Sequence, residues 1–226
     1  MNEPIAPSSI FLKCREQQQQ LNTVFTQVSN ELTISAINRL KAQVLLLSDW
    51  LFTLSEQNSD VVLAQALGHP SSLLPHTNQA FVAAVVMAKF THRLHCHGQH
   101  GRLLISTALT MNISLLINNN GLSVALHKNP KLNTEQLKQY QQYPLMSTQF
   151  LNKHQIIDKS GLHWVLGHKE LLDGSGFPAH IKQHKIPFNM QLLGVIAKFA
   201  ELTSPREYRA PARVKQVMSY LLKHQH

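Results

Sequence analysis

Residues 167–178 read GHKELLDGSGFP and are the most informative part of the chain. The apolar spacing before this segment predicts a helix that ends at Leu172, where a glycine-rich turn begins. Gly174 and Gly176 are suited to positive φ angles, at which a side chain would clash with the backbone. A generic turn after a helix explains an Asp-Gly or Ser-Gly pair alone. The unbroken string DGSGFP is more specific than such a turn.

Outward from this segment, apolar residues recur at helical spacing along most of the chain. Between residues 32 and 67 they include Leu40 and Val44, and we expect Asn58 and Ser59 to divide this region into two helices. Strand patterns are sparse. The sequence therefore predicts an all-α fold.

The second half of the chain gives further helix boundaries. One apolar helix is expected over 103–116. Asn133 is expected to cap a helix that runs to Tyr143, with Gln136 reaching back to the cap, and a separate helix is expected from Pro144 to residue 154. The remaining helices are expected over 77–94, 161–172, 190–202 and 211–223.

The composition is that of a folded protein. Of the 226 residues, 43% are hydrophobic and 15% are charged, which excludes a disordered chain. No apolar run approaches the ~20 residues that cross a bilayer, and the first residues lack the basic and apolar regions of a signal peptide. Cys14 and Cys96 are far apart in the sequence. We therefore expect no disulfide, no membrane span and a cytoplasmic location.

The positive charge lies mainly in the second part of the chain. The net charge is +9, but residues 1–75 carry 4 basic and 6 acidic side chains, whereas residues 76–226 carry 17 basic and 6 acidic ones. A basic second part attracts anions such as nucleotides, nucleic acid or an acidic partner. A solvated basic face explains the same charge equally well.

Residues 173–178 resemble the Asp-Gly-Ser-Gly-Tyr-Pro signature of HD-GYP domains, which hydrolyse the bacterial messenger cyclic di-GMP. Ile186 and Pro187 follow it as in the family, and residues 202–209 resemble the family's Leu-Thr-Ser-Asp-Arg-Pro-Tyr-Arg segment. His76 begins a helix much as the family's first histidine does. These segments occur in order and at spacings similar to those of the family.

The resemblance covers roughly residues 60–215 of the chain. It implies an HD-domain helical bundle of the HD-GYP type over residues 61–226. Residues 1–60 would then form an N-terminal helical extension.

Family enzymes hold two or three metal ions, commonly iron, in a cage of histidines and carboxylates. In this chain His76 and His168 keep a donor, and Glu170 and Asp173 are residual family positions. The other ligand positions carry residues that do not suit a metal cage: Ser72, Met111, Asn112, Tyr143, Lys169 and Ala197. A lysine ammonium ~4 Å from a cation costs about 4 kcal/mol per unit charge at an effective dielectric of about 20. The resemblance thus implies a catalytically degenerate phosphodiesterase without a metal or another cofactor, although the family uses iron or manganese.

Four side chains are candidates for binding a ligand: Arg206, Arg209, Phe177 and Lys169. The guanidinium of arginine suits bidentate recognition of phosphate, whereas the simpler interpretation is an arginine on an exposed loop. Phe177 replaces the family's tyrosine and keeps a ring that can stack on guanine. We expect a signalling module that acts through a protein partner in a bacterial pathway, with cyclic di-GMP as its candidate ligand and no role in nucleic-acid binding.

Two alternatives stay open. An active phosphodiesterase with an atypical metal site needs ligands from elsewhere, such as His163, Glu170 or Asp173. A purely structural interaction module would resemble HDOD domains, which also lack metal ligands, although DGSGFP favours HD-GYP descent. Family domains usually continue past the last predicted helix, so we expect apolar surface at that edge to favour a homodimer or a partner.

Overall fold

The computed structural model describes residues 7–68, 73–96, 98–117, 121–129 and 131–223, apart from the side chains of residue 7 and of residues 55–59. Within these ranges the chain forms helices and turns, and the β interaction found there is one bridge between Arg206 and Arg209. The predicted all-α fold is therefore confirmed. The helices are α1 (Pro7–Asn30), α2 (Ile34–Ala66), α3 (Pro75–Arg93), α4 (Gly98–Thr110), α5 (Ile113–Ile117), α6 (Leu122–Lys128), α7 (Thr134–Lys153), α8 (Lys159–Gly167), the 3-10 turn η1 (Gln183–Lys185), α9 (Phe188–Thr203) and α10 (Val214–Lys223).

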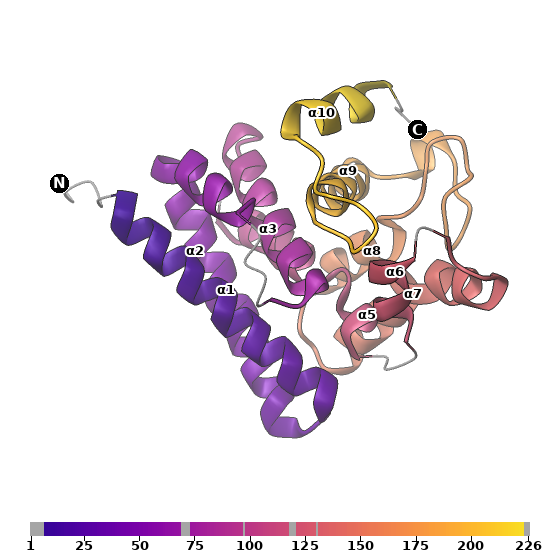
Figure 1. The fold of residues 1–226 in the computed structure, drawn as a ribbon, viewed down its shortest axis with the longest axis horizontal. Coiled ribbons are helices and arrows are strands. Elements are labelled where there is room, and N and C mark those ends of the chain that lie inside the picture. The colour runs from indigo at the N-terminus through magenta and orange to yellow at the C-terminus, as the bar shows by residue number, and fades with distance from the viewer. Residues whose placement is uncertain (1–6, 69–72, 97, 118–120, 130, 224–226) are drawn as a thin grey trace.

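Helix α3 lies at the centre of the bundle. The long hairpin of α1 and α2 runs along one side of the molecule, and α3 separates it from α7, α8 and α9 (Figure 1). Every residue of α3 from His76 to Ala88 is buried, as expected for a helix that is covered on all sides over this length. Its first turn buries polar side chains as well, including His76 and Gln79. A polar region therefore lies inside the bundle at the start of α3.

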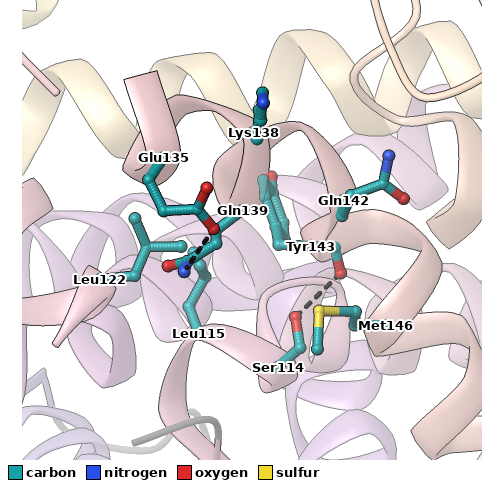
Figure 2. A pocket seen from close by; sticks show the side chains of 9 residues that line it. All are labelled: Ser114, Leu115, Leu122, Glu135, Lys138, Gln139, Gln142, Tyr143 and Met146. Atoms are coloured by element: carbon teal, nitrogen blue, oxygen red, sulfur yellow. Dashed lines mark hydrogen bonds between the residues drawn. The ribbon is translucent and has the colours of Figure 1, made fainter. Parts of the chain in front are cut away.

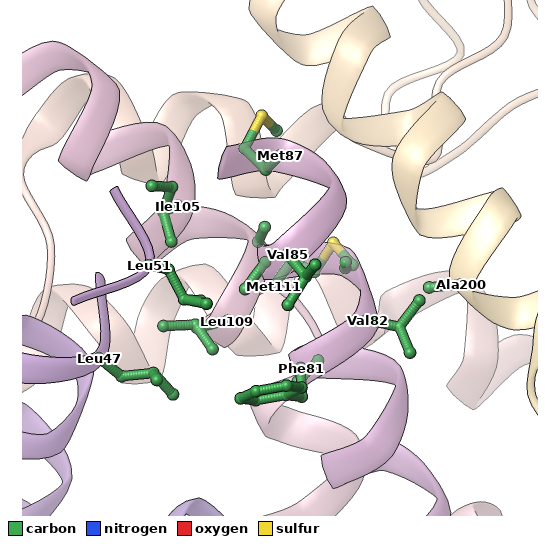
Figure 3. Close-up of a cluster of buried hydrophobic side chains, with 14 of the residues drawn as sticks. Leu47, Leu51, Phe81, Val82, Val85, Met87, Ile105, Leu109, Met111 and Ala200 are labelled. Atoms are coloured by element: carbon green, nitrogen blue, oxygen red, sulfur yellow. The ribbon is translucent and has the colours of Figure 1, made fainter. Parts of the chain in front are cut away.

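One apolar core joins the N-terminal hairpin to the other helices. Leu47 and Leu51 of α2 lie beside Phe81 of α3 and Leu109 of α4 (Figure 3). Burial of a side chain of this size contributes about 1.5–3 kcal/mol. Because α2 runs through residue 60 without a break and shares this core, packing is continuous across the expected boundary. The division into an extension and a domain stays a prediction.

The predicted break near residue 58 is wrong. Helix α2 continues through Asn58 and Ser59. These residues weaken a helix only slightly, whereas Leu54 and Val62 on either side of them are buried in the core. Tertiary packing thus outweighs a weak local signal.

Several other predicted helix ends also differ from the structure. Helix α7 continues through Pro144, where the preceding residue is held by a hydrogen bond from the Ser114 hydroxyl to its carbonyl (2.8 Å). The region 103–116 forms two helices, α4 and α5, separated by a turn. Helix α8 ends at Gly167 and not at Leu172, because the chain turns there with the Glu170 N–H donating to the Gly167 carbonyl (2.9 Å). Helix α10 begins after Pro211 and not at it.

The predicted cap of α7 is present in full. The Asn133 side chain accepts a hydrogen bond from the Gln136 N–H (2.8 Å), and the Gln136 side chain accepts one from the Asn133 N–H (3.0 Å). We expect Asn133→Ala to lower the free energy of unfolding by about 1 kcal/mol in urea titrations. The exposed Asn152 near the other end of α7 provides the control, and Asn152→Ala is expected to change stability little. Equal effects of the two changes would contradict the capping interpretation.

One described segment, Gly98–Ile117, is long and apolar enough to cross a membrane by length and composition alone. This differs from the expectation that no apolar run reaches such a length. However, 72% of its most apolar window is buried inside the bundle, and α4 packs against α2, α3 and α8. The segment therefore has the surroundings of a core helix.

Candidate functional site

A small cavity of about 60 Å³ lies among the start of α3, the middle of α7, the end of α9 and the turn at 206–208. Six of the positions that the resemblance singled out line this one space: His76, Asn112, Tyr143, Lys169, Ala197 and Arg206. The residues that line it are His76, Gln79, Asn112, Leu115, Leu126, Tyr140, Tyr143, Lys169, Ala197, Glu201, Arg206 and Tyr208. Met111, in contrast, points into the apolar core and is 1% exposed.

His168 has both ring nitrogens engaged. Its Nδ1 lies 2.6 Å from the carbonyl oxygen of Val165, so this nitrogen carries the proton and donates. Its Nε2 then accepts a hydrogen bond from the Tyr143 hydroxyl (2.7 Å). Burial and the neighbouring Lys169 lower the pKa of His168 to about 3, and burial raises the pKa of Tyr143. The imidazole is thus neutral, and no lone pair on it is left for a metal.

Lys169 forms the charged centre of the site. Its ammonium lies 3.6 Å from the Glu201 carboxylate, and only 15% of its side chain is exposed. Burial opposes its charge, but the oxygens of Tyr140, Tyr143 and Glu201 outweigh burial and raise the pKa of Lys169. Although burial opposes the charge of Glu201 too, Lys169 and its other cationic neighbours hold the pKa of Glu201 below the usual range. The two side chains therefore form a charged pair.

His76 faces the cavity from the first turn of α3. Its side chain is almost fully buried, and neither ring nitrogen has a hydrogen-bond partner among the described residues. Burial first, and then the Arg206 guanidinium, lower the pKa of His76 to about 4, while the amide of Gln79 acts in the opposite direction. His76 is therefore a neutral ring with unused hydrogen-bonding capacity.

Glu170 and Asp173 organise the loop that follows α8. The two carboxylate oxygens of Glu170 accept hydrogen bonds from the N–H groups of Ala179 (2.6 Å) and Ile181 (3.0 Å). Asp173 Oδ1 accepts from both the N–H (2.8 Å) and the hydroxyl of Ser175 (2.7 Å). These contacts give both acidic residues a structural role in the DGSGFP loop.

Phe177 belongs to an aromatic cluster beside the cavity. Its ring centroid lies 5.5 Å from that of Tyr140 in an edge arrangement, and Tyr140 lies 5.2 Å from Tyr143. Such pairs stabilise the fold beyond the area they bury. The ring of Phe177 is therefore already packed against protein aromatics.

The two candidate arginines have different surroundings. The Arg209 guanidinium donates to the carbonyls of Leu202 (2.9 Å) and Glu201 (3.1 Å), at the C-terminal end of α9 where carbonyls lack helical partners. Arg206 instead lines the cavity, and its Nη1 is buried with no partner within the described ranges. Arg206 is thus the arginine placed to meet a ligand, whereas contacts with α9 already account for Arg209.

Sequence reasoning missed Tyr140 and Glu201, which complete the site. Each lies on the same helix face as a position that was identified. Tyr140 precedes Tyr143 by about one turn of α7, and Glu201 follows Ala197 by about one turn of α9. A search of the sequence one helical turn away from the identified positions would therefore have found Tyr140 and Glu201.

A larger pocket of about 270 Å³ opens next to this site (Figure 2). Leu115 and Tyr143 line both spaces, so Tyr143 stands in the wall between them. The side chains of Glu135 and Gln139 are joined by a hydrogen bond (3.2 Å) at its edge. Its lining is mainly apolar and shows no cluster of ligand-type donors.

The side chains present do not suit the iron or manganese that the resemblance implies. His168 has no free lone pair, Glu170 is bonded to the loop, and Lys169 lines the cavity with its ammonium paired to Glu201. Over the described ranges, no three His, Cys, Asp or Glu side chains are grouped closely enough to hold a metal ion. His163, a candidate ligand of the alternative site, lies exposed on α8. A cation would also meet the repulsion of Lys169 and Arg206.

Comparison with known proteins identifies the family. The sequence model described as HD domain matches residues 47–226. The chain belongs to the HD domain family. No curated protein matches the sequence of this HD domain protein. Among solved structures it is similar to Bd1817, a HDG"Y"P protein from Bdellovibrio bacteriovorus, with a TM-score of 0.69 and 13% identity over 92% of this chain.

The similarity to Bd1817 extends over 63% of that protein, so this chain spans less than two thirds of its length. At this identity the similarity shows a shared fold. Together with the family match, it confirms the expected all-α HD-domain bundle.

Proposed function

We propose that this HD domain protein is a catalytically degenerate HD-GYP module that signals through protein contacts and holds no metal. The observation that carries the proposal is the state of the His168–Lys169 pair. The Tyr143 hydroxyl donates a hydrogen bond to the Nε2 of His168, and the Lys169 ammonium is paired with Glu201. Metal activation of water requires free imidazole and carboxylate donors, and this pair supplies neither.

The alternative of an atypical active site has less support. Its extra ligands would be His163, Glu170 and Asp173. Glu170 and Asp173 bind their own loop, and His163 is exposed on α8. Residues that serve separate structural contacts do not form a metal cage.

The proposal is tested with the full chain. Purified protein is analysed for iron, manganese and zinc, and is then incubated with cyclic di-GMP in the presence of added iron or manganese. We expect no stoichiometric metal and no hydrolysis. Metal-dependent turnover that disappears in His168→Ala would overturn the proposal and establish the active-site alternative.

Titration calorimetry with cyclic di-GMP separates a messenger-binding module from a purely structural HDOD-like one. The cavity is far smaller than the ~300–1,000 Å³ pockets that enclose ligands of moderate size, so a dinucleotide would have to bind over its mouth. There it would meet Arg206 and the half-exposed Tyr208. If the messenger binds, we expect Arg206→Ala to weaken it by about tenfold or more, and the exposed Arg213→Ala to leave it unchanged. An absence of binding heat would favour the structural module.

A protein partner or a second copy is part of the same proposal. Helix α10 exposes apolar side chains, among them Met218 and Leu222. Exposed apolar groups of this kind favour association. Two unpaired cysteines, Cys14 and Cys96, accord with the cytoplasmic location that we propose. Light scattering of the purified chain tests for the dimer.

A further inference from the structure

The small cavity at the start of α3 contains several buried polar atoms that lack partners. They are both ring nitrogens of His76, Nε2 of Gln79, Oδ1 of Asn112 and Nη1 of Arg206, none of which has a hydrogen bond to another described residue. All four side chains line the same cavity. Unpaired polar groups are costly in a protein interior, and their occurrence together indicates that something else satisfies them.

The charges around the cavity favour an anion. Lys169 and Arg206 line it, and both carry a positive charge. Glu201 is the carboxylate among its lining residues, and it is already paired with Lys169 (3.6 Å) and Lys198 (3.1 Å). The guanidinium of Arg206 therefore keeps a donor for a ligand of opposite charge.

The size of the cavity limits the ligand. A volume of about 60 Å³ compares with the ~10–15 Å³ that one water molecule needs. The cavity thus takes a few water molecules or one compact ion, and excludes a nucleoside. Its mixture of donors and acceptors fits a small anion that still carries a proton.

We propose that this cavity binds one tetrahedral oxyanion of the phosphate type, held by Arg206, Gln79 and His76. Arg206 Nη1, Gln79 Nε2 and the N–H of His76 donate to its oxygens. Asn112 Oδ1 and the other ring nitrogen of His76 accept from a protonated oxygen. Phosphate carries such a proton at neutral pH and sulfate does not, so the site selects phosphate. The inference rests on the metal-free site of the proposed function.

The test uses the full chain after its metal content has been shown to be negligible, in a buffer without phosphate. Inorganic phosphate and then sulfate are titrated by calorimetry. We expect saturable binding of one phosphate per chain and at least about tenfold weaker binding of sulfate, because sulfate leaves the buried acceptors unpaired. Phosphate is also expected to raise the melting temperature, since it binds only the folded chain.

Two variants locate the site. Arg206→Gln removes the positive charge and is expected to lower the affinity for phosphate by about tenfold or more. Gln79→Leu removes one donor with little change of side-chain volume, so it is expected to weaken phosphate binding. The melting temperature of the free protein is expected to stay the same or rise, because an unpaired buried polar group is removed. The exposed Arg213→Gln is the matched control and is expected to bind as the wild type does. Phosphate should also shift the His76 ring resonances in NMR spectra of the wild type.

Distinct results overturn the two proposals. Folded, metal-free protein that shows no saturable phosphate binding would mean that the cavity holds water alone. If Arg206→Gln and Gln79→Leu both bind phosphate as tightly as the wild type, the anion must bind elsewhere. If the wild type binds sulfate as tightly as phosphate, the buried acceptors do not select the ligand. Stoichiometric metal in the purified chain would instead overturn the proposed function.

Discussion

Gly176→Ala is expected to lower the free energy of unfolding by about 3 kcal/mol. A Cβ atom at this position would lie 2.5 Å from the Lys169 carbonyl oxygen and 2.5 Å from Glu170 Cα, and it would also collide with the backbone nitrogen of Leu171. These are backbone atoms, which cannot turn aside as the end of a flexible side chain can. The same carbonyl accepts a hydrogen bond from the Phe177 N–H (3.0 Å), so relief of the collision would also disturb the site.

Urea titration monitored by circular dichroism measures this effect. The neighbouring Ser175→Ala is the control, because Ser175 is exposed and its N–H still donates to Asp173 after the change. We expect the control to lose about 1 kcal/mol at most. A Gly176→Ala variant as stable as this control would show that the loop does not approach the end of α8 as closely as described.

The DGSGFP loop illustrates what the sequence predicts well. Its turn chemistry is local, because Asp173 bonds to Ser175 two residues later and Gly174 has the predicted positive φ, 81°. The positive φ predicted at Gly176 is wrong, and a side chain is excluded there because a Cβ atom would collide with the backbone of residues 169–171. The capping box at Asn133 is local in the same sense. Family resemblance added the positions of His76, Lys169 and Arg206, which the fold gathers around one cavity although they are distant in the chain.

Contacts between distant side chains were not predictable from the sequence. The resemblance placed Tyr143 and His168 at two ligand positions, but it did not indicate that the tyrosine donates to the histidine. It marked Lys169 as unfavourable for a metal without identifying Glu201 as its partner. Such pairs depend on the relative placement of α7, α8 and α9, which is set by core packing and not by local preference.

The predicted helix boundaries were wrong for a related reason. Asn58, Ser59 and Pro144 are unfavourable within a helix, yet α2 and α7 continue through them. Each helix is held by buried neighbours on both sides of the weak point. The stabilisation from these neighbours exceeds the local cost, and it is visible only once the partners of the helix are known.

Acidification between about pH 6.5 and pH 5 is expected to lower the free energy of unfolding by about 2 kcal/mol per pH unit on average. His76 and His168 normally titrate near 6.5, but in the folded chain their pKa values are about 4 and about 3. Across this interval the number of extra protons bound by the unfolded chain therefore rises from about one at pH 6.5 to nearly two at pH 5. Stability is complete above the unfolded value and is lost as the pH falls towards the folded values. Against a typical total of about 5–15 kcal/mol, the loss is large.

Urea unfolding at several pH values in a buffer without phosphate measures this slope. Carboxylates contribute little in the chosen interval, because the depressed pKa of Glu201 affects stability only below the ordinary carboxyl range. We expect His168→Gln to reduce the dependence of the unfolding free energy on pH by about half, because only His76 then takes up a proton on unfolding. The exposed His163→Gln should keep the wild-type slope although it removes the same kind of side chain. A flat wild-type profile would mean that the two rings are hydrated or already charged in the folded chain, and the neutral Tyr143–His168 pair that excludes a metal would then be wrong.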